Sequence, residues 1–451
     1  MRAPAGQIAF GPFCLDADGP RLLRSGVELE LRPQALHALR TLVQSSGRCV
    51  DYEEMIANAW HGISVSRHTV AVTVGEVKRA LKEYGVWISY HPKRGYRLDI
   101  PHSEDLIRNG WHHWQRHTRE GFEKGLFCFQ KAAQESSNDF QAHEGISRCY
   151  LMLGTFAMRP PREMYAAFLD AHARAVELGG LTPELRGDRA QGLHVFELRF
   201  EEAESELLLA QRENPRTAGV YIRLAVLYAT MKRFEEALDA LRHAYAVDAL
   251  WPILPAAEVL IRCCRGEFEA AVACGKTALE LHPYLALGRS HYAQALEFSG
   301  RFEEALVQYR LASVMSPDLP RLRAEEARCL ALHGRALEAQ VILGELEELR
   351  QTEYVDGYYM AFLYESLGRL EEAFVEMERA AAENSPHLFM MDVDPRMDGM
   401  RDDARFARLR SRVFRSNPAQ KVAQLRREAK GKLVIAPYTE KATSLPHRVA
   451  S

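Results

Sequence analysis

The sequence repeats itself every 34 residues between residues 199 and 373, and this period limits the possible folds more than any other feature. The segment RFEEA occurs three times, with its alanine at Ala203, Ala237 and Ala305. Related segments fill the remaining steps of the same ladder, with alanines at Ala271, Ala339 and Ala373. Such a period is typical of stacked helix pairs, because each pair leaves an apolar face that only the next pair can cover. The sequence therefore predicts an all-α solenoid here.

The residues around each alanine complete a repeat motif. Around Ala305, Gly300 precedes a helix, Tyr309 and Ala312 face inward, and Pro317 ends the helix. This pattern resembles the tetratricopeptide repeat. Two less regular units come first, near residues 106–139 and 140–183, and the second carries an insertion at 155–162. We expect a repeat array over residues 102–387, with about eight helix pairs and regular from residue 184.

Strand-like and helix-like segments share the first hundred residues. Residues 8–15 indicate a strand interrupted by a Gly-Pro pair, and residues 21–31 indicate a hairpin. Three amphipathic helices follow, the first opened by Pro33, the second capped by Asp51 and the third capped by Ser66. Residues 87–90 and 96–100 form a last hairpin with Gly95 in its turn. We expect a mixed head at residues 1–101 on a mainly α protein.

Five segments of this head resemble the winged-helix effector domain of OmpR/PhoB-type response regulators. They are FGPFCLD, LRPQALHALRTLV, YEEMIANAW, HTVAVTVGEVKRAL and RGYRL. The resemblance implies a winged helix-turn-helix domain that binds double-stranded promoter DNA, with residues 66–81 as the recognition helix and residues 91–95 as the wing. The candidate DNA-binding residues are Ser66, Arg67, His68, Thr69, Thr73, Glu76, Lys78, Arg79, Lys93 and Arg94.

The predicted recognition helix is poor in cations. Gly75 stands where a long basic side chain is common in the resembled domain, and Glu76 follows it. A glutamate can accept a hydrogen bond from cytosine N4 but repels a nearby phosphate. We therefore expect weaker DNA binding, with a shallower salt dependence, than for a strongly basic head.

The combination of head and repeats resembles HilA- and CadC-like transcriptional regulators. The matching segments in the body are RHTREGFEKGLFCFQKA, MRPPREMYAAFLDAHARAVELG and DPRMDGMRDDARFARLR. CadC-like proteins carry a membrane helix between the two parts, but no run of roughly 18 apolar residues occurs here. The chain also lacks a signal-peptide core and a segment pattern for a receiver domain. We expect a cytoplasmic protein with no membrane partner and no control by aspartyl phosphorylation.

No arrangement of residues predicts catalysis, a metal or a cofactor. His113 and His117 are one helical turn apart, but two ligands without a third make a weak metal site. Cys263, Cys264 and Cys274 fit small buried repeat positions better than redox chemistry. Phosphate-binding loops and nucleophile motifs are missing from the sequence. The sequence therefore predicts a binding protein rather than an enzyme.

The C-terminal part is expected to cap the array and then to become a basic tail. We expect a capping helix in residues 388–415, centred on 394–412, whose Phe406 and Leu409 cover the last repeat. Residues 416–451 are polar and basic, which predicts disorder or a frayed helix. Residues 405–451 hold 12 Lys and Arg against 2 Asp and Glu, whereas residues 101–404 hold 33 against 49. This difference in charge between an acidic body and a basic tail bears on which partners the protein binds and does not indicate a fold.

Two functions of different classes fit these features. The first is a DNA-binding transcriptional regulator whose repeats bind a protein partner, an effector or a second copy of the chain, with RNA polymerase as a further partner that this role allows. The second is a repeat scaffold or adaptor whose head binds DNA weakly or not at all, which Gly75 and Glu76 favour. Replacing Lys93 and Arg94 separates the two, because only a regulator would lose DNA affinity and promoter output.

Overall fold

A computed structural model describes residues 7–10, 13–16, 21–24, 27–45, 47–82, 87–99 and 103–415 of the chain. Contacts between backbone positions divide the chain into two units, Met1–Trp111 with Cys128–Asn138, and His112–Phe127 with Asp139–Ser451. The boundary between them crosses helices α4 (Ser103–Trp114) and α5 (Arg119–Glu135). The described part of the head, which lies within residues 7–99, belongs wholly to the first unit. The basic tail at 416–451 lies outside the described residues.

The head begins with a four-stranded antiparallel meander, β1 (Gln7–Phe10), β2 (Phe13–Asp16), β3 (Leu22–Arg24) and β4 (Val27–Leu29). The prediction of one interrupted strand at residues 8–15 is wrong. Those residues form two strands that pair with each other, Ile8 opposite Leu15 and Phe10 opposite Phe13. Gly11 and Pro12, which separate the two strands in the sequence, lie outside the described residues.

Three helices form the centre of the head, α1 (Pro33–Gln44), α2 (Tyr52–Ala59) and α3 (Arg67–Lys82). Pro33 occupies the first turn of α1, and the Asp51 carboxylate caps α2 by accepting from the Glu54 N–H at 2.8 Å. The predicted apolar stripe of α3 is buried, at Val70, Val74, Val77 and Leu81. It packs in one core with side chains of α1 and of the strands.

A two-stranded hairpin, β5 (Trp87–His91) and β6 (Gly95–Asp99), completes the head. Tyr96 in β6 also exchanges two backbone hydrogen bonds with Val50, at 2.7 and 2.9 Å. This bridge brings the Val50 carbonyl so close to Gly95 that any Cβ there would collide with it. Gly95 has φ +95°, so the unusual backbone angle expected for the turn is confirmed.

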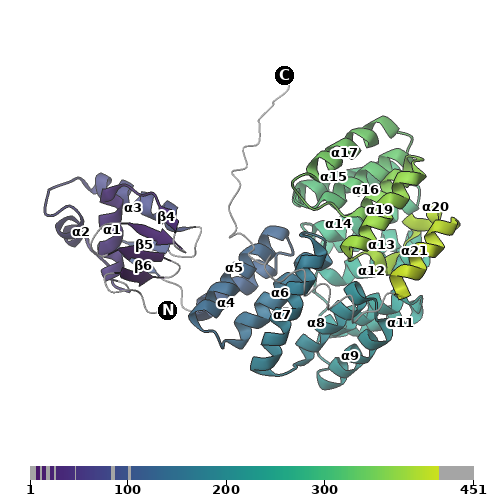
Figure 1. Cartoon of the computed structure of the whole chain (residues 1–451), viewed down its shortest axis with the longest axis horizontal. Helices are drawn as coiled ribbons and strands as arrows, with labels where there is room; N and C mark the ends of the chain where they lie inside the picture. The colour runs from purple at the N-terminus through teal and green to yellow at the C-terminus, as the bar shows by residue number, and fades with distance from the viewer. Residues whose placement is uncertain are drawn as a thin grey trace. The chain divides into compact units, whose positions relative to one another are not determined.

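Pairs of antiparallel helices follow one another through the body (Figure 1). After α4 and α5 come α6 (Phe140–Thr155) with α7 (Pro161–Gly179), and α8 (Pro183–Gly192), ending in a π-helical turn η1 (Leu193–Glu197), with α9 (Phe200–Glu213). The remaining pairs are α10 (Ala218–Thr230) with α11 (Phe234–Val247), α12 (Ile253–Arg265) with α13 (Phe268–Leu281), α14 (Ala286–Phe298) with α15 (Phe302–Met315), α16 (Pro320–Leu332) with α17 (Ala336–Leu349), and α18 (Gly357–Ser366) with α19 (Leu370–Glu383).

The six alanines of the 34-residue ladder lie early in the second helix of their pairs and are fully buried. Each is the small residue that lets the two helices of a pair approach closely. The first helices of successive pairs also pack on one another, with α10 against α12, α12 against α14, and α16 against α18. Each 34-residue period therefore corresponds to one helix pair that stacks on the next, as the sequence predicts.

Residues 388–415, here called the closing segment, follow the last helix pair. They form two 3-10 turns, η2 (Leu388–Met390) and η3 (Pro395–Met397), and two helices, α20 (Asp398–Arg401) and α21 (Ala404–Arg415). The expectation of one capping helix centred on residues 394–412 is therefore wrong. The Asp394 side chain accepts from the Arg396 N–H at 3.0 Å and caps a turn there, so regular helix resumes only at residue 398. Phe406 and Leu409 are buried.

Contacts within the second unit also join parts of the body that are distant in sequence. The Arg119 guanidinium at the start of α5 forms an ion pair with Glu353 at 2.9 Å. Arg162 in α7 donates to the carbonyl of Ala382 in α19 at 3.3 Å, across 220 positions of sequence. Early and late helix pairs of the second unit are therefore in contact. Among the described residues, every helix is too short or too polar to cross a membrane.

Candidate nucleic-acid interface

Helix α3 begins at a side-chain cap and presents its first turn outward. The Ser66 hydroxyl accepts from the Thr69 N–H at 3.1 Å and lies 2.9 Å from the Thr69 hydroxyl. Because the Ser66 hydroxyl satisfies a backbone N–H at the helix end, and the Thr69 hydroxyl holds it in place, the two side chains position the first turn of α3. Ser66 and Thr69 remain exposed, as do Arg67 and His68.

The exposed face of α3 carries cations at both ends. Arg67 lies over the ring of Tyr52 in α2, 5.2 Å from its centre, which orients the guanidinium. Lys78 and Arg79 are exposed three turns further along the helix. Residues 68, 72, 75 and 79 recur at three- and four-residue spacing and so share one face of the helix.

Thr73 does not belong to this face. Only 4% of its surface is exposed, which removes it from the candidate DNA contacts. The reason is helical geometry, since residue 73 is three positions after Val70 and four before Val77, both in the core.

Glu76 is held within the head by Arg32, the residue that precedes α1. The Arg32 Nε donates to Oε2 of Glu76 at 2.6 Å, its Nη2 donates to the same oxygen, and its backbone N–H donates to Oε1 at 3.2 Å. These hydrogen bonds lower the pKa of Glu76 and raise that of Arg32. Since Arg32 already neutralises the carboxylate, Glu76 connects two helices of the head and is a poor candidate for base recognition.

The turn between β5 and β6 presents Lys93 and Arg94 to solvent. Lys93 has φ +65°, a left-handed conformation, and the Arg94 N–H donates to the His91 carbonyl at 3.0 Å. The His91 ring in turn lies 2.9 Å from the Ser89 hydroxyl. The backbone of the turn is thus fixed by local hydrogen bonds, while its two cationic side chains extend outward.

The sequence reasoning missed two exposed apolar residues in the middle of α3, Ala71 and Val72. Val72 is 46% exposed. The sequence held a signal for Val72, because residue 72 lies four positions after His68 and seven before Arg79, on the face that the sequence predicts to contact DNA. Small apolar side chains at such positions can contact a thymine methyl group.

The two histidines considered as metal ligands lie in α4 and in the loop after it. Burial lowers the pKa of both His113 and His117. Within the described residues, neither is grouped with enough His, Cys, Asp or Glu side chains to hold a metal ion.

Comparison with known proteins identifies both parts of the chain. The family model of the transcriptional regulatory protein C-terminal domain matches residues 26–98, and a tetratricopeptide-repeat model matches residues 218–249. The transcriptional activator CadC of Escherichia coli K12 is 33% identical over 98 residues, which cover 21% of this chain and 19% of CadC. The mouse superkiller complex protein 3 is 24% identical over 392 residues, which cover 79% of this chain and 23% of that protein.

The chain thus spans about a fifth of the length of these curated relatives. Among solved structures, a thermophilic tetratricopeptide-repeat protein of Thermus thermophilus is 22% identical, with a TM-score of 0.37, and covers 43% of this chain and 98% of its own. A monomeric mutant of human IFIT1 is 13% identical, with a TM-score of 0.49, over 77% of this chain and 90% of its own. The chain therefore carries an N-terminal domain of the OmpR/PhoB-type transcriptional regulatory family, followed by tetratricopeptide repeats.

Proposed function

We propose that this protein is a DNA-binding regulator of transcription whose head places α3 in the major groove of promoter DNA. The observation that carries the proposal is the pattern of exposed cations on a head of the regulatory family. Arg67, Lys78 and Arg79 are exposed on α3, and Lys93 and Arg94 on the adjoining hairpin. An α-helix fits the major groove, which is about 12 Å wide, while a basic turn beside it can reach a phosphate or the minor groove.

The proposed contacts divide by chemistry. Lys93 and Arg94 bind the DNA backbone, because their side chains extend from a turn rather than from the helix. Arg67, His68, Lys78 and Arg79 reach phosphates or base edges, and Ala71 and Val72 approach thymine methyl groups. Ser66 caps α3 by accepting from the Thr69 N–H, and both hydroxyls lie at the end of the helix that approaches the DNA backbone in this proposal. Because Thr73 is buried and Glu76 is neutralised by Arg32, only the few remaining exposed side chains of α3 are available to recognise DNA bases.

We also propose that the repeats bind a protein partner or a second copy of the chain. The head matches a family of regulatory domains, and part of the body matches a family of repeats. Proteins of both kinds generally act by binding other macromolecules. Two heads joined through their repeats would read two half-sites, which multiplies the modest affinity of one head. RNA polymerase is a further partner in this proposal, and a role on promoter DNA places the protein in the cytoplasm with the chromosome.

The test uses the full-length protein and sheared genomic DNA. Duplexes retained by the immobilised protein are labelled and titrated with wild-type protein and with a Lys93→Ala/Arg94→Ala variant. We expect salt-sensitive, saturable binding by the wild type. For the variant we expect affinity lower by roughly tenfold and a salt slope shallower by about 1 to 2 units, because two phosphate contacts are lost.

A matched control removes the same charge from the repeats. Arg242 and Lys276 are exposed on α11 and α13, so an Arg242→Ala/Lys276→Ala variant should bind DNA like the wild type. The regulator proposal fails if no duplex is enriched, or if both double variants weaken binding equally.

A repeat adaptor with a weak head is the second candidate, and the Arg32–Glu76 ion pair favours it, because it leaves α3 with few free polar groups. An adaptor predicts that the Lys93→Ala/Arg94→Ala variant keeps both its protein partner and its effect on transcription. Transcript changes in cells that carry this variant therefore distinguish the two functions.

A further inference from the structure

A cavity of about 50 Å³, here called the junction cavity, lies where early and late helix pairs of the second unit meet. Most of its wall comes from the connections between α4 and α5, α6 and α7, α13 and α14, and α15 and α16. The first residues of α14 and α16 and the last residue of α15 complete it. The cavity is therefore built from loops and helix ends, and not from the long faces along which helices pack on one another.

The polar groups of this wall favour an anion. Arg116 is exposed at its rim, and Arg321, His117, Thr118 and Ser316 also line it. None of the described residues that line the cavity is an aspartate or a glutamate. A concave site lined by charge of one sign attracts ligands of the opposite sign.

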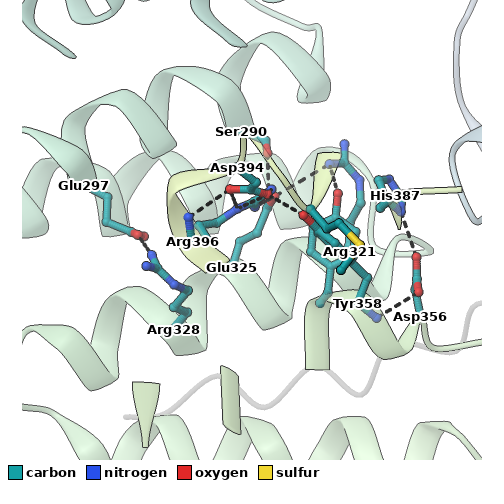
Figure 2. A network of polar contacts seen from close by, with 12 residues as sticks. Ser290, Glu297, Arg321, Glu325, Arg328, Asp356, Tyr358, His387, Asp394 and Arg396 are labelled. Atoms are coloured by element: carbon teal, nitrogen blue, oxygen red, sulfur yellow. Dashed lines mark hydrogen bonds and ion pairs between the residues drawn. The ribbon is translucent and has the colours of Figure 1, made fainter. Parts of the chain in front are cut away.

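Arg321 is the buried cation of the wall, with 9% of its surface exposed. Figure 2 shows it in a network of polar contacts of the body. Its Nη1 donates to the Tyr359 hydroxyl at 3.4 Å and lies 3.7 Å from Glu325, whose carboxylate has a closer partner in Arg396 at 3.0 Å. The Arg321 Nε has no hydrogen-bond partner among the described residues. Because a buried donor without a partner costs free energy, an acceptor bound beside Arg321 would relieve that cost.

Two helices of 13 residues, α14 and α16, begin at the cavity without a side-chain cap. Leu285 precedes α14 and Leu319 precedes α16, and leucine cannot accept a hydrogen bond from the first N–H groups of a helix. Residues 286 and 287 of α14 and residue 321 of α16 line the cavity. The unpaired N–H groups and the helix dipole add partial positive charge on this side of the cavity.

His117 and Thr118 add neutral donors from the loop after α4. The His117 Nδ1 is buried and has no hydrogen-bond partner within the described part of the chain. Burial lowers the pKa of His117, so its ring is neutral near pH 7 and can donate from one nitrogen. The Thr118 oxygen accepts from the Gly121 N–H at 3.0 Å, which fixes the hydroxyl at the start of α5.

The rest of the wall is apolar and limits the size of a ligand. Phe156 and Met158 contribute from the connection after α6, and Leu287, Met315 and Leu319 from the late pairs. One water molecule needs about 10–15 Å³ of such space, so the cavity has room for about four or five non-hydrogen atoms. Cations and helix ends beside an apolar wall suit a molecule with an anionic head and a short apolar tail.

We propose that the junction cavity binds a small carboxylate with a short apolar tail, of about the size of propionate. Arg321, Arg116 and the N-termini of α14 and α16 attract the carboxylate, and Phe156 and Met158 contact the tail. A ligand that binds only the folded protein stabilises it, so this ligand strengthens the contact between early and late helix pairs. The proposal concerns the second unit alone and does not depend on DNA binding by the head.

The experiment titrates propionate into the full-length protein at constant ionic strength and follows binding by saturation-transfer NMR of the ligand. We expect a dissociation constant on the order of a millimolar, because a ligand of this size makes few contacts. Propionamide has the same shape without the charge, and hexanoate has the charge with a longer tail. Both should bind at least roughly tenfold more weakly than propionate.

Two variants place the ligand in the junction cavity. Ala286→Leu fills the cavity and should abolish binding, whereas Ala336→Leu, at the exposed first residue of α17, is the matched control and should bind like the wild type. Arg116→Ala removes a charge at the rim and should weaken binding severalfold. Arg242→Ala removes an exposed charge on α11 and should leave binding unchanged.

Circular dichroism and cooperative melting establish that each variant is folded. If Ala286→Leu does not fold, the comparison of Arg116→Ala with Arg242→Ala decides the location, since both residues are exposed. The proposal is overturned if the wild type does not bind propionate, or if propionamide binds as tightly. It is also overturned if the cavity variant binds like its control, or if phosphate at the same concentration displaces propionate, which would indicate a general anion site.

Discussion

His194 lies where the closing segment meets an early part of the body. Its Nε2 is 3.1 Å from the Thr230 hydroxyl, and its ring packs between Phe200 and Phe389. Only 4% of the residue is exposed, and burial lowers the pKa of His194 to about 3. The folded protein therefore holds this imidazole neutral at pH values where an exposed histidine is protonated.

This burial predicts acid sensitivity. Below about pH 6.5 the unfolded chain takes up a proton at residue 194 that the folded chain refuses, so the free energy of unfolding falls as the pH drops toward the folded pKa. Between pH 7 and 5 this one group should account for about 2 kcal/mol. Urea denaturation at both pH values, on wild type and on His194→Gln, measures the difference. Equal losses in the two proteins would contradict the assignment.

At the candidate interface, the sequence could predict the burial of one residue but not an ion pair between two elements. The burial of Thr73 was available from the sequence, because its spacing from Val70 and Val77 places it on the core side. The Arg32–Glu76 contact was not, since it joins residues 44 positions apart and no periodic pattern relates them. Exposure on a helix follows from periodicity, whereas ion pairs between elements depend on tertiary structure.

At the scale of elements, the periodic parts were predictable and the irregular parts were not. The three helices of the head and the 34-residue helix pairs follow from apolar spacing and caps. The prediction of one strand at residues 8–15 is wrong because the run of apolar residues there belongs to two strands, which the Gly-Pro pair separates. The error in the closing segment came from treating residues 394–412 as amphipathic helix, although Asp394 competes with the helix by capping a turn.

The hairpin β5–β6 depends on one glycine. Alanine at Gly95 would meet the Val50 carbonyl and would also have to adopt φ +95°. We expect Gly95→Ala to destabilise the head by about 1–3 kcal/mol and to weaken DNA binding by moving Lys93 and Arg94. Hydrogen exchange of the β5–β6 amides in the full-length protein measures the local effect.

Gly75 is the matched control for that substitution. It lies within α3, and a Cβ there meets nothing within 4 Å. Gly75→Ala should therefore stabilise α3 by up to about 1 kcal/mol and slow exchange of its amides. If both alanines had the same effect, the close approach at Gly95 would not be the cause.

At the scale of the whole molecule, the repeats form a body whose distant parts touch. The Arg119–Glu353 pair is largely buried, with side chains 13% and 24% exposed. We expect Glu353→Ala to lower the free energy of unfolding by about 1–2 kcal/mol, between the values for exposed and buried ion pairs. Urea unfolding measures this loss, and Glu348→Ala, an exposed site in the preceding helix, should leave it unchanged. Identical curves for the two variants would mean that the contact carries no stability.

This closure could not have been predicted from the sequence. The 34-residue period specifies how each pair packs on the next, but long-range contacts depend on the small rotation between pairs, summed over the array. The irregular units before residue 184 and the closing segment after residue 387 supply those contacts. They are also the parts whose sequence departs furthest from the repeat motif.

An array whose ends are free can gain or lose a unit in evolution, because each repeat touches only its neighbours. The contacts of Arg162 with Ala382 and of His194 with Phe389 remove that freedom. Deleting or duplicating one 34-residue unit would separate both pairs of residues at once. The number of repeats in the second unit is therefore fixed by these contacts, and we expect that unit to unfold and to vary as a whole.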